Sequence, residues 1–260
     1  MNMRAYILCV LIIASCMAFP PGAIAACDAR SGPKTAALVE LYTSEGCSSC
    51  PPADQQLRRL RQALDPAAVV VPLALHVDYW DYIGWKDPYA KDSFGERQSW
   101  LVRANRQRTV YTPQFFVNGI ELRSWRDELK DAVRRRNALP AAAEIHLLAR
   151  IAPDGVLVLD ATATARAGAE PAVLYLALAE SGLASTVSRG ENSGVTLAHD
   201  HVVRVWVGPV RLIDGAARVQ RHIALPAAWN RAQLELVAFV QGERTGGVLQ
   251  ALSAQQCASS

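Results

Sequence analysis

The feature that most restricts the fold of this chain is a pair of cysteines, Cys47-Ser48-Ser49-Cys50, set between regular segments. The run 36–42 before it is apolar and bounded by turn residues, which favours a buried strand. Residues 53–64 after it carry Leu at helical spacing, which predicts an amphipathic helix, and the run 69–77 predicts a second buried strand. A Cys-x-x-Cys pair in such a unit is typical of a redox motif rather than of half a zinc site.

The chain continues with alternating elements up to about residue 140. Two further helices are expected, over residues 90–108 and 125–136. Between them, Thr112-Pro113 leads into a strand over residues 115–117, and Asn118-Gly119 is a strong signal for a hairpin turn.

From Glu144 onward the pattern changes to short β-rich runs separated by Pro, Gly and Asp turns, which predicts antiparallel sheets. These runs are 145–151, 155–165, 172–180, 201–210, 217–225 and 234–241. We therefore expect an α/β domain over residues 33–138, followed by a mainly-β, β-sandwich-like domain over residues 143–256. This boundary rests on the change from alternating helices and strands to short β-rich runs.

The N-terminal segment has the pattern of an export signal. Arg4 precedes an apolar run over residues 5–14, and the small-x-small site Ala23-Ile24-Ala25 follows, so residues 1–25 are expected to be a signal peptide. The chain is then periplasmic or secreted. An alternative is a lipoprotein anchored through Cys16. No later apolar stretch approaches the roughly 18–20 residues of a membrane-spanning helix, so no transmembrane segment is expected in the mature chain.

Signal cleavage leaves Cys27 and Cys257 beside the closely spaced pair, in a compartment where disulfides persist. We expect Cys27 and Cys257 to form a structural disulfide that ties the ends of the mature chain together. The alternative is two unpaired surface thiols, because sequence separation does not show whether the two residues approach each other.

The charge pattern argues against a polyanionic partner. Lys and Arg number 27 and Asp and Glu 24, for a formal net charge of +3, and the basic residues form no long stripe. Nucleic acid is not an expected partner. The cysteine pair indicates instead a protein or small molecule that carries a thiol or a disulfide, and no cofactor is expected.

The order strand, Cys-x-x-Cys, helix, Thr-Pro, strand, hairpin and helix resembles the thioredoxin fold over residues 36–136. The resemblance implies a thioredoxin-like first domain with a cis-proline, Pro113, beside the cysteines. It also implies that Cys47 is the attacking thiol and Cys50 the resolving one. The chain departs from thioredoxin in having its prolines, Pro51 and Pro52, after the cysteines, and these are expected to delay the helix start.

Four longer stretches are similar to the signatures of a family of exported bacterial proteins designated a domain of unknown function (DUF1223). They are ELYTSEGCSSCPPAD, HVDYWDYIGWKDP, YTPQFFVNG and RGENSGVTLAHDHVVR. The resemblance implies the fold and export, and it implies no substrate.

The candidate catalytic residues are Cys47, Cys50 and Pro113. Candidates for substrate contact or for a proton relay are Glu45, His76, Asp78, Trp80 and Thr112. His76 is expected to be a core histidine rather than a metal ligand. The His199-Asp200-His201 stretch is expected to be an exposed turn rather than a metal pair. No metal site is expected.

Two thiols at this spacing suit thiol-disulfide exchange, in which one attacks a disulfide and the other releases the product. The leading hypothesis is therefore a thiol-disulfide oxidoreductase. One alternative is a copper-binding protein or copper chaperone that uses Cys47, Cys50 and His76 as soft ligands for Cu(I). Another is a non-catalytic periplasmic binding module. These three hypotheses leave open whether the protein is an enzyme.

Overall fold

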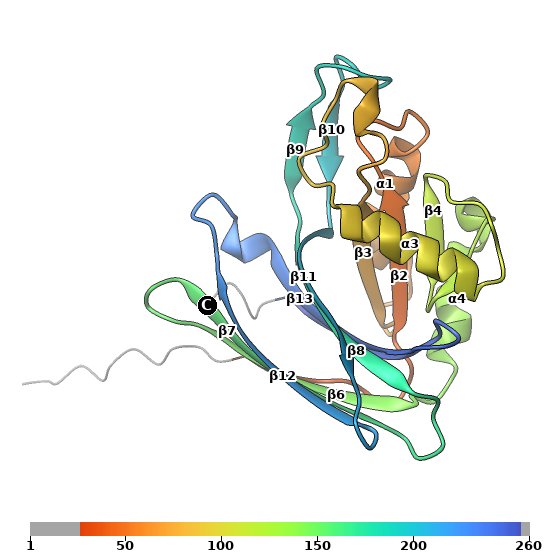
Figure 1. Ribbon diagram of the computed structural model, residues 1–260, viewed down its shortest axis with the longest axis vertical. Helices are drawn as coiled ribbons and strands as arrows, with labels where there is room; N and C mark the ends of the chain where they lie inside the picture. Colours follow the sequence, from red (N-terminus) through yellow and green to blue (C-terminus); the bar gives the residue numbers. More distant parts are fainter. Residues whose placement is uncertain (1–26, 256–260) are drawn as a thin grey trace, which may run out of the picture.

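The structure is a computed structural model and describes residues 27–255 (Figure 1). The expected signal peptide over 1–25, the alternative anchor at Cys16, and Cys257 of the expected disulfide with Cys27 involve residues outside this range. Those three expectations stay predictions.

The helices of the described chain lie mostly in its first half. They are α1 (Pro51–Arg58), α2 (Leu60–Ala63), α3 (Asp92–Ala104) and α4 (Trp125–Asn137), with short 3-10 helices η1 (Asp81–Ile83) and η2 (Arg231–Gln233). The strands of the first half are β2 (Ala37–Thr43), β3 (Val70–His76), β4 (Gln114–Val117) and β5 (Ile120–Glu121). The remaining strands are β1 (Cys27–Arg30), β6 (Ala143–Ile151), β7 (Val156–Ala165), β8 (Ala172–Glu180), β9 (Leu183–Thr186), β10 (Thr196–His199), β11 (Val202–Arg211), β12 (Ala216–Ala224), β13 (Leu234–Gly242) and β14 (Val248–Ala254).

One eight-stranded sheet, in the order β14-β13-β8-β11-β3-β2-β4-β5, runs through both halves of the described chain. Within it β2 pairs parallel with β3 and antiparallel with β4. The halves meet where β11 pairs parallel with β3, with Val202 opposite Ala74. The division into domains at 138 and 143 stays a prediction, and this sheet is continuous across it.

Three hydrophobic cores hold the layers together. One face of the large sheet packs under α3, in a core that includes residues of β2, β3, β8, β11 and β13. On the opposite face, α1 and α4 cover β2 and β4, while the four-stranded sheet β1-β6-β7-β12 packs against β8, β13 and β14. Figure 1 shows α3 lying across β2 and β3, with β6, β7 and β12 below them.

The coarser fold expectation is confirmed, because the chain is a mixed α/β structure that combines a sheet containing parallel strands with antiparallel sheets. The expected hairpin is also present: Asn118 and Gly119 have positive φ values of 49° and 79° between β4 and β5. The short strands β1, β9, β10 and the longer β14 were not expected.

The expected delay of the first helix was wrong. The helix α1 begins at Pro51, and Cys50 is its N-cap residue with helical angles, φ −79° and ψ −37°. The reason is that the first turn of a helix needs no backbone N–H donors, so proline is tolerated there.

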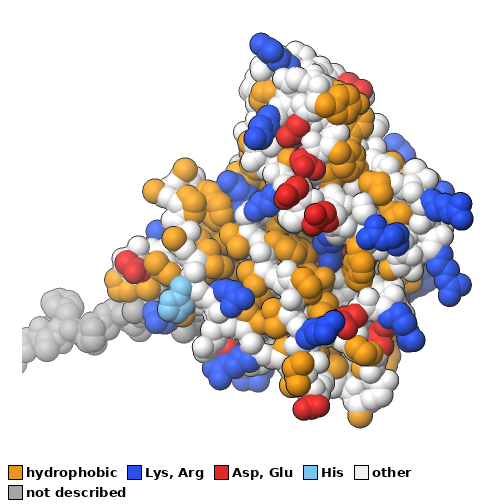
Figure 2. All heavy atoms as spheres, in the orientation of Figure 1, with side chains coloured by type: hydrophobic (Ala, Val, Ile, Leu, Met, Phe, Trp, Pro, Cys, Tyr) orange, Lys and Arg blue, Asp and Glu red, His pale blue; other side chains and the backbone are white. Residues whose placement is uncertain are grey.

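The surface in Figure 2 carries charges of both signs. Acidic side chains gather in the upper middle of that face, and Lys and Arg are scattered over its edges and its lower middle. No continuous basic stripe crosses the face shown.

A buried arginine connects the two halves. Arg97 of α3 donates through Nε to Glu40 of β2 at 2.7 Å and through Nη2 to Gln241 of β13 at 2.9 Å. Its guanidinium also lies 4.7 Å from the ring centre of Tyr175 and 4.8 Å from that of Trp206. Burial opposes the charge on Arg97, but the Glu40 carboxylate outweighs this and raises the pKa of Arg97.

Replacing Arg97 by Met keeps most apolar contacts but leaves the Glu40 carboxylate buried without a counter-charge. We expect the free energy of unfolding to fall by about 3–5 kcal/mol, as measured by urea unfolding at neutral pH. Adding Glu40→Gln should recover part of the loss. The exposed Arg103→Met on the same helix is the matched control, and a wild-type midpoint for Arg97→Met would contradict the role assigned to the pair.

Candidate functional site

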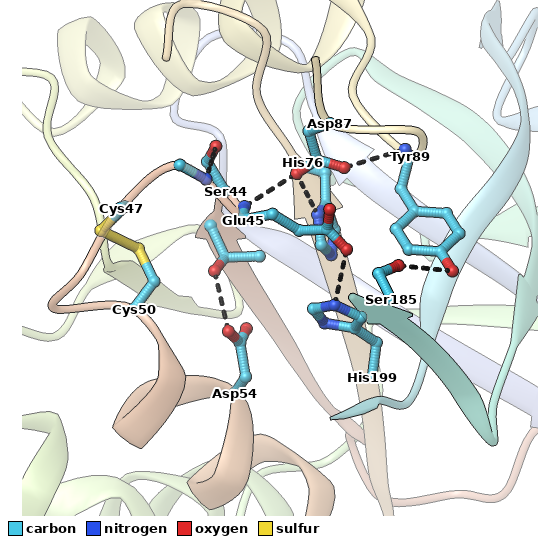
Figure 3. Close-up of polar contacts among 12 residues, drawn as sticks. Ser44, Glu45, Cys47, Cys50, Asp54, His76, Asp87, Tyr89, Ser185 and His199 are labelled. Carbon is cyan, nitrogen blue, oxygen red and sulfur yellow. Dashed lines mark hydrogen bonds and ion pairs between the residues drawn. A yellow bond between two sulfur atoms is a disulfide. The ribbon is translucent and has the colours of Figure 1, made fainter. Parts of the chain in front are cut away.

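The two cysteines form a disulfide in the turn between β2 and α1 (Figure 3). The exposed fraction is 1% for Cys47 and 0% for Cys50, whereas Ser48 and Ser49 between them are exposed. Cys47 Sγ lies 3.3 Å from Ser49 Oγ. The disulfide is therefore covered, and only the serines of the turn reach the surface.

The loop between β9 and β10 lies against the cysteine turn. The buried Asn192 side chain donates through Nδ2 to the carbonyl oxygens of Glu45 at 2.8 Å and of Cys47 at 3.0 Å. Glu191 accepts a hydrogen bond from the Ser48 backbone N–H at 3.0 Å. The second half of the chain thus holds the turn in place.

Directly before the cysteines, the fully buried Glu45 carboxylate receives two hydrogen bonds from opposite parts of the molecule. Trp85 Nε1 donates to Glu45 Oε2 at 2.8 Å, and His199 Nε2 of β10 lies 2.9 Å from Oε1. A buried carboxylate needs such partners because it has lost its water.

A second buried pair lies beside it, between His76 at the end of β3 and Asp87. His76 Nδ1 is 2.7 Å from Asp87 Oδ2, and the same carboxylate accepts from the backbone N–H groups of Glu45 and Tyr89, each at 2.9 Å. Burial lowers the pKa of His76, but Asp87 outweighs it and the net shift is upward. Burial likewise raises the pKa of Asp87, but His76 and the two N–H groups bring it below its ordinary value.

A third acidic group, Asp54, is partly buried on α1, four residues after Cys50. Its Oδ2 accepts from the Thr43 hydroxyl at the end of β2 at 3.2 Å. Burial raises the pKa of Asp54 from 3.8 to about 6, against the opposing effect of His76 and His199. Asp54 therefore exchanges its proton close to neutral pH.

A family model described as a protein of unknown function (DUF1223) matches residues 38–241. The chain belongs to the DUF1223 family. The resemblance noted from the sequence is confirmed by this match.

Two solved structures are similar to this DUF1223 chain. Protein AGR_C_4864 from Agrobacterium tumefaciens is 26% identical, with a TM-score of 0.56 over 85% of this chain and 94% of that chain. HBP35 of Porphyromonas gingivalis is 17% identical, with a TM-score of 0.67 over 86% of this chain and 76% of that chain, and shows a likeness of fold. No curated protein matches the chain.

The other residues singled out from the sequence lie in two places. The Thr112–Pro113 bond is cis, and Trp80 Nε1 donates to Thr112 Oγ1 at 2.7 Å. Trp80 also packs on the cysteine turn, because a Cβ added at Gly46 would lie 3.0 Å from Trp80 Cβ. Asp78 is separate from these buried groups, with its carboxylate near Gly95 of α3. The roles proposed for these residues stay predictions.

The expectation of an exposed turn at His199-Asp200-His201 was wrong. His199 is 3% and His201 8% exposed, because the parallel pairing of β11 with β3 draws this stretch into the structure. The sequence analysis also gave no role to Asp54, Asp87 or Asn192. The signal that pointed to these residues was the set of family-like stretches: ELYTSEGCSSCPPAD ends at Asp54, HVDYWDYIGWKDP contains Asp87, and RGENSGVTLAHDHVVR contains Asn192 and His199.

No helix within residues 27–255 is long and apolar enough to cross a membrane. Over the same range, no group of three or more His, Cys, Asp or Glu side chains is placed to hold a metal ion.

Asn192→Ala should make the disulfide easier to reach. It removes two hydrogen bonds that hold the loop on the cysteine turn, each worth about 1 kcal/mol, so we expect reduction by dithiothreitol to accelerate roughly tenfold or more. Ser193→Ala is the matched control, because its hydroxyl bonds only to Ser188 within the same loop. Equal reduction rates for wild type and Asn192→Ala would contradict a covering role.

Asp54→Asn should raise the free energy of unfolding at high pH but not at low pH. Because the folded-state pKa of Asp54 is raised to about 6, its contribution to stability is complete below about pH 4 and is lost as the pH rises through 6. We expect the variant to match wild type at pH 4 and to exceed it by about 1–2 kcal/mol at pH 8 in urea unfolding, after allowance for its partial exposure. The exposed Asp214→Asn should show no such divergence with pH.

Proposed function

We propose that this DUF1223 protein is an exported thiol-disulfide oxidoreductase in which Cys47 and Cys50 exchange disulfides with a thiol-bearing or disulfide-bearing partner. The observation that carries the proposal is the Cys47–Cys50 disulfide in the turn from a central parallel strand to a helix N-terminus. Two thiols at this position can alternate between a disulfide and a dithiol without any other change in the chain.

The architecture supports the same proposal. The strand order β3-β2-β4-β5, with α1 following the cysteines and Thr112-Pro113 just before β4, is thioredoxin-like. The packing of β1-β6-β7-β12 against β8, β13 and β14 is β-sandwich-like. We infer that the second half serves as a docking and covering module for the first, because its loop at Asn192 lies on the cysteine turn.

In this function Cys47 is the attacking group and Cys50 the resolving group. The Cys47 thiolate attacks a sulfur of the partner's disulfide, forms a mixed disulfide and releases one partner thiolate. The Cys50 thiolate then attacks Cys47 Sγ, which re-forms the internal disulfide and releases the second partner thiolate. The partner gains two electrons and, from solvent and the site, two protons; the reverse sequence oxidises a partner dithiol.

The helix N-terminus favours the thiolate in this scheme. Because α1 begins at Pro51, its positive end lies next to the cysteines, and such a position lowers the pKa of a thiol. The Ser49 hydroxyl, 3.3 Å from Cys47 Sγ, can donate to the same thiolate.

The copper alternative, with Cys47, Cys50 and His76 as ligands, has weaker support. His76 Nδ1 is engaged by Asp87, and the described residues contain no preformed set of three ligands. A non-catalytic binding module is the remaining alternative. The localisation proposed is the periplasm or the exterior, on the basis of the signal-like segment at residues 1–25.

The two cysteines should behave differently when replaced. Cys47→Ser is expected to abolish exchange, whereas Cys50→Ser should accumulate a mixed disulfide through Cys47, because the thiol that releases the partner is gone. Capture from a periplasmic extract, followed by non-reducing electrophoresis and release with reductant, measures the trap. The double variant Cys47→Ser/Cys50→Ser is the matched control for non-covalent capture.

The alternatives predict other outcomes of the same experiment. A structural clip would lose stability similarly in both single variants and trap nothing. A copper site would lose Cu(I) affinity in both single variants. A redox titration of the wild-type pair that shows no reversible two-electron step would rule out the oxidoreductase.

A further inference from the structure

Two buried histidines, one from each half of the chain, share an unusual arrangement. His76 engages Asp87 through Nδ1, and His199 engages Glu45 through Nε2, so each imidazole is oriented by a carboxylate. The ring centroids are 5.1 Å apart and nearly perpendicular, at 79°. Figure 3 shows the two rings near each other, with His76 at the end of β3 and the disulfide to the left of both.

The other nitrogen of each ring has no hydrogen-bond partner among the described residues. In the described part of the chain, His76 Nε2 and His199 Nδ1 are buried and have no hydrogen-bond partner. An unpaired buried polar atom costs about 1–3 kcal/mol, so a purely structural histidine would be expected to satisfy both nitrogens. A free nitrogen on an oriented imidazole is suited to accepting and returning a proton.

The third member of this group, Asp54, connects the histidines to the cysteines. Its backbone N–H donates to the Cys50 carbonyl at 3.1 Å, so Asp54 lies one helical turn after Cys50 on α1. Both histidines act electrostatically on its carboxyl group. Asp54 makes no hydrogen bond to either ring among the described contacts, so transfer between them needs one water molecule or a rotation of the carboxyl group.

We propose that His199 and His76 complete the thiol site as a buried proton relay, which takes from Asp54 the proton released by Cys50 during resolution. This inference rests on the thiol-disulfide exchange proposed above. In the step concerned, the Cys50 S–H proton passes to Asp54, the Cys50 thiolate attacks Cys47 Sγ, and the mixed disulfide breaks. The electron pair of the broken bond leaves with the partner sulfur, while the proton on Asp54 moves to the free nitrogen of a histidine and later returns to solvent.

The surrounding charges suit this task. Three carboxylates face the two histidines: Asp54 from α1, Glu45 from the cysteine turn and Asp87 from the segment after β3. The Tyr89 ring packs against both imidazoles, and the two imidazoles face each other. Glu45 and Asp87 offset positive charge on the two imidazoles. The positive charge that an added proton gives either ring is shared with the other ring nitrogen, and that nitrogen faces a carboxylate.

The relay predicts that resolution, and not the first attack, depends on His199. The reduced protein is mixed with an aromatic disulfide that releases a coloured thiolate twice, first when Cys47 attacks and again when Cys50 resolves. In wild type the rate of the second phase should rise with pH with a midpoint near the Asp54 pKa of about 6, well below that of an ordinary thiol at about 8.5.

The variant His199→Gln can keep the hydrogen bond to Glu45 but carries no proton. We expect its second phase to slow about tenfold or more at pH 6 and its midpoint to move upward, because His199 lowers the pKa of Asp54. The first phase should change by less than about twofold. His76→Asn, which can keep the bond to Asp87, should give the same pattern if His199→Gln does not fold.

The matched control is His201→Asn. His201 is a third buried histidine, two residues after His199, and it contacts Glu235 instead. It should leave both phases at wild-type rates. A wild-type midpoint near that of an ordinary thiol, or an unchanged second phase in a folded His199→Gln or His76→Asn protein, would overturn the relay and leave the exchange function intact. Loss of both phases in wild type would instead overturn the exchange function itself.

Discussion

The parallel pairing of β11 with β3 is the constraint on which the rest of the arrangement depends. Its contact is short, with Val202 opposite Ala74 and the Ala74 N–H donating to the His201 carbonyl at 2.8 Å. It nevertheless fixes where the chain enters β11, and just before that point the His199 ring lies 5.1 Å from that of His76, at the carboxyl end of β3. In sheets with parallel strands this edge is where ligands and reactive groups gather. The hairpin of β9 and β10 is thereby placed beside the cysteine turn.

The junction between the halves is held by buried charge as well as by apolar packing. Arg97 connects α3 to β2 and β13, and Glu235 of β13 is bound by Arg61 of α2 and by His201. Burial would raise the pKa of Glu235, but these partners bring it down to about 2. Replacing one partner strands a buried charge, so such pairs penalise a wrong relative placement of the halves more than apolar contacts do. This precision matters because the site takes residues from both halves.

Local patterns in the sequence were enough for the elements around the cysteines but not for the site as a whole. The strand before Cys47, the helix after Cys50 and the turn at Asn118-Gly119 each have a signal within about ten residues. By contrast, β9 and β10 are four-residue strands that pair with each other, and they are too short to show a clear period in the sequence. The burial of His199 depends on the pairing of β11 with β3 at Ala74, which is distant in the sequence. The pattern of apolar residues around His199 therefore could not predict it. The prediction of a delayed helix start was wrong because proline is tolerated in the first turn of a helix, where α1 has Pro51 and Pro52.

The covered state of the disulfide has a consequence for how a partner would be chosen. Cys47 and Cys50 are 1% and 0% exposed, so a partner sulfur can reach the pair only if the cysteine turn moves, and the loop carrying Glu191 and Asn192 is hydrogen-bonded to that turn. The bonds that hold this loop end on the backbone of the cysteine turn itself, at the Ser48 N–H and the Cys47 carbonyl. A partner whose own backbone or side chains replace those bonds would open the site at little net cost, whereas a small thiol without them would bear the full cost of opening. In the proposed exchange function, access and recognition would then be one event, because the bonds that a partner replaces are those between the second half of the chain and the cysteine turn.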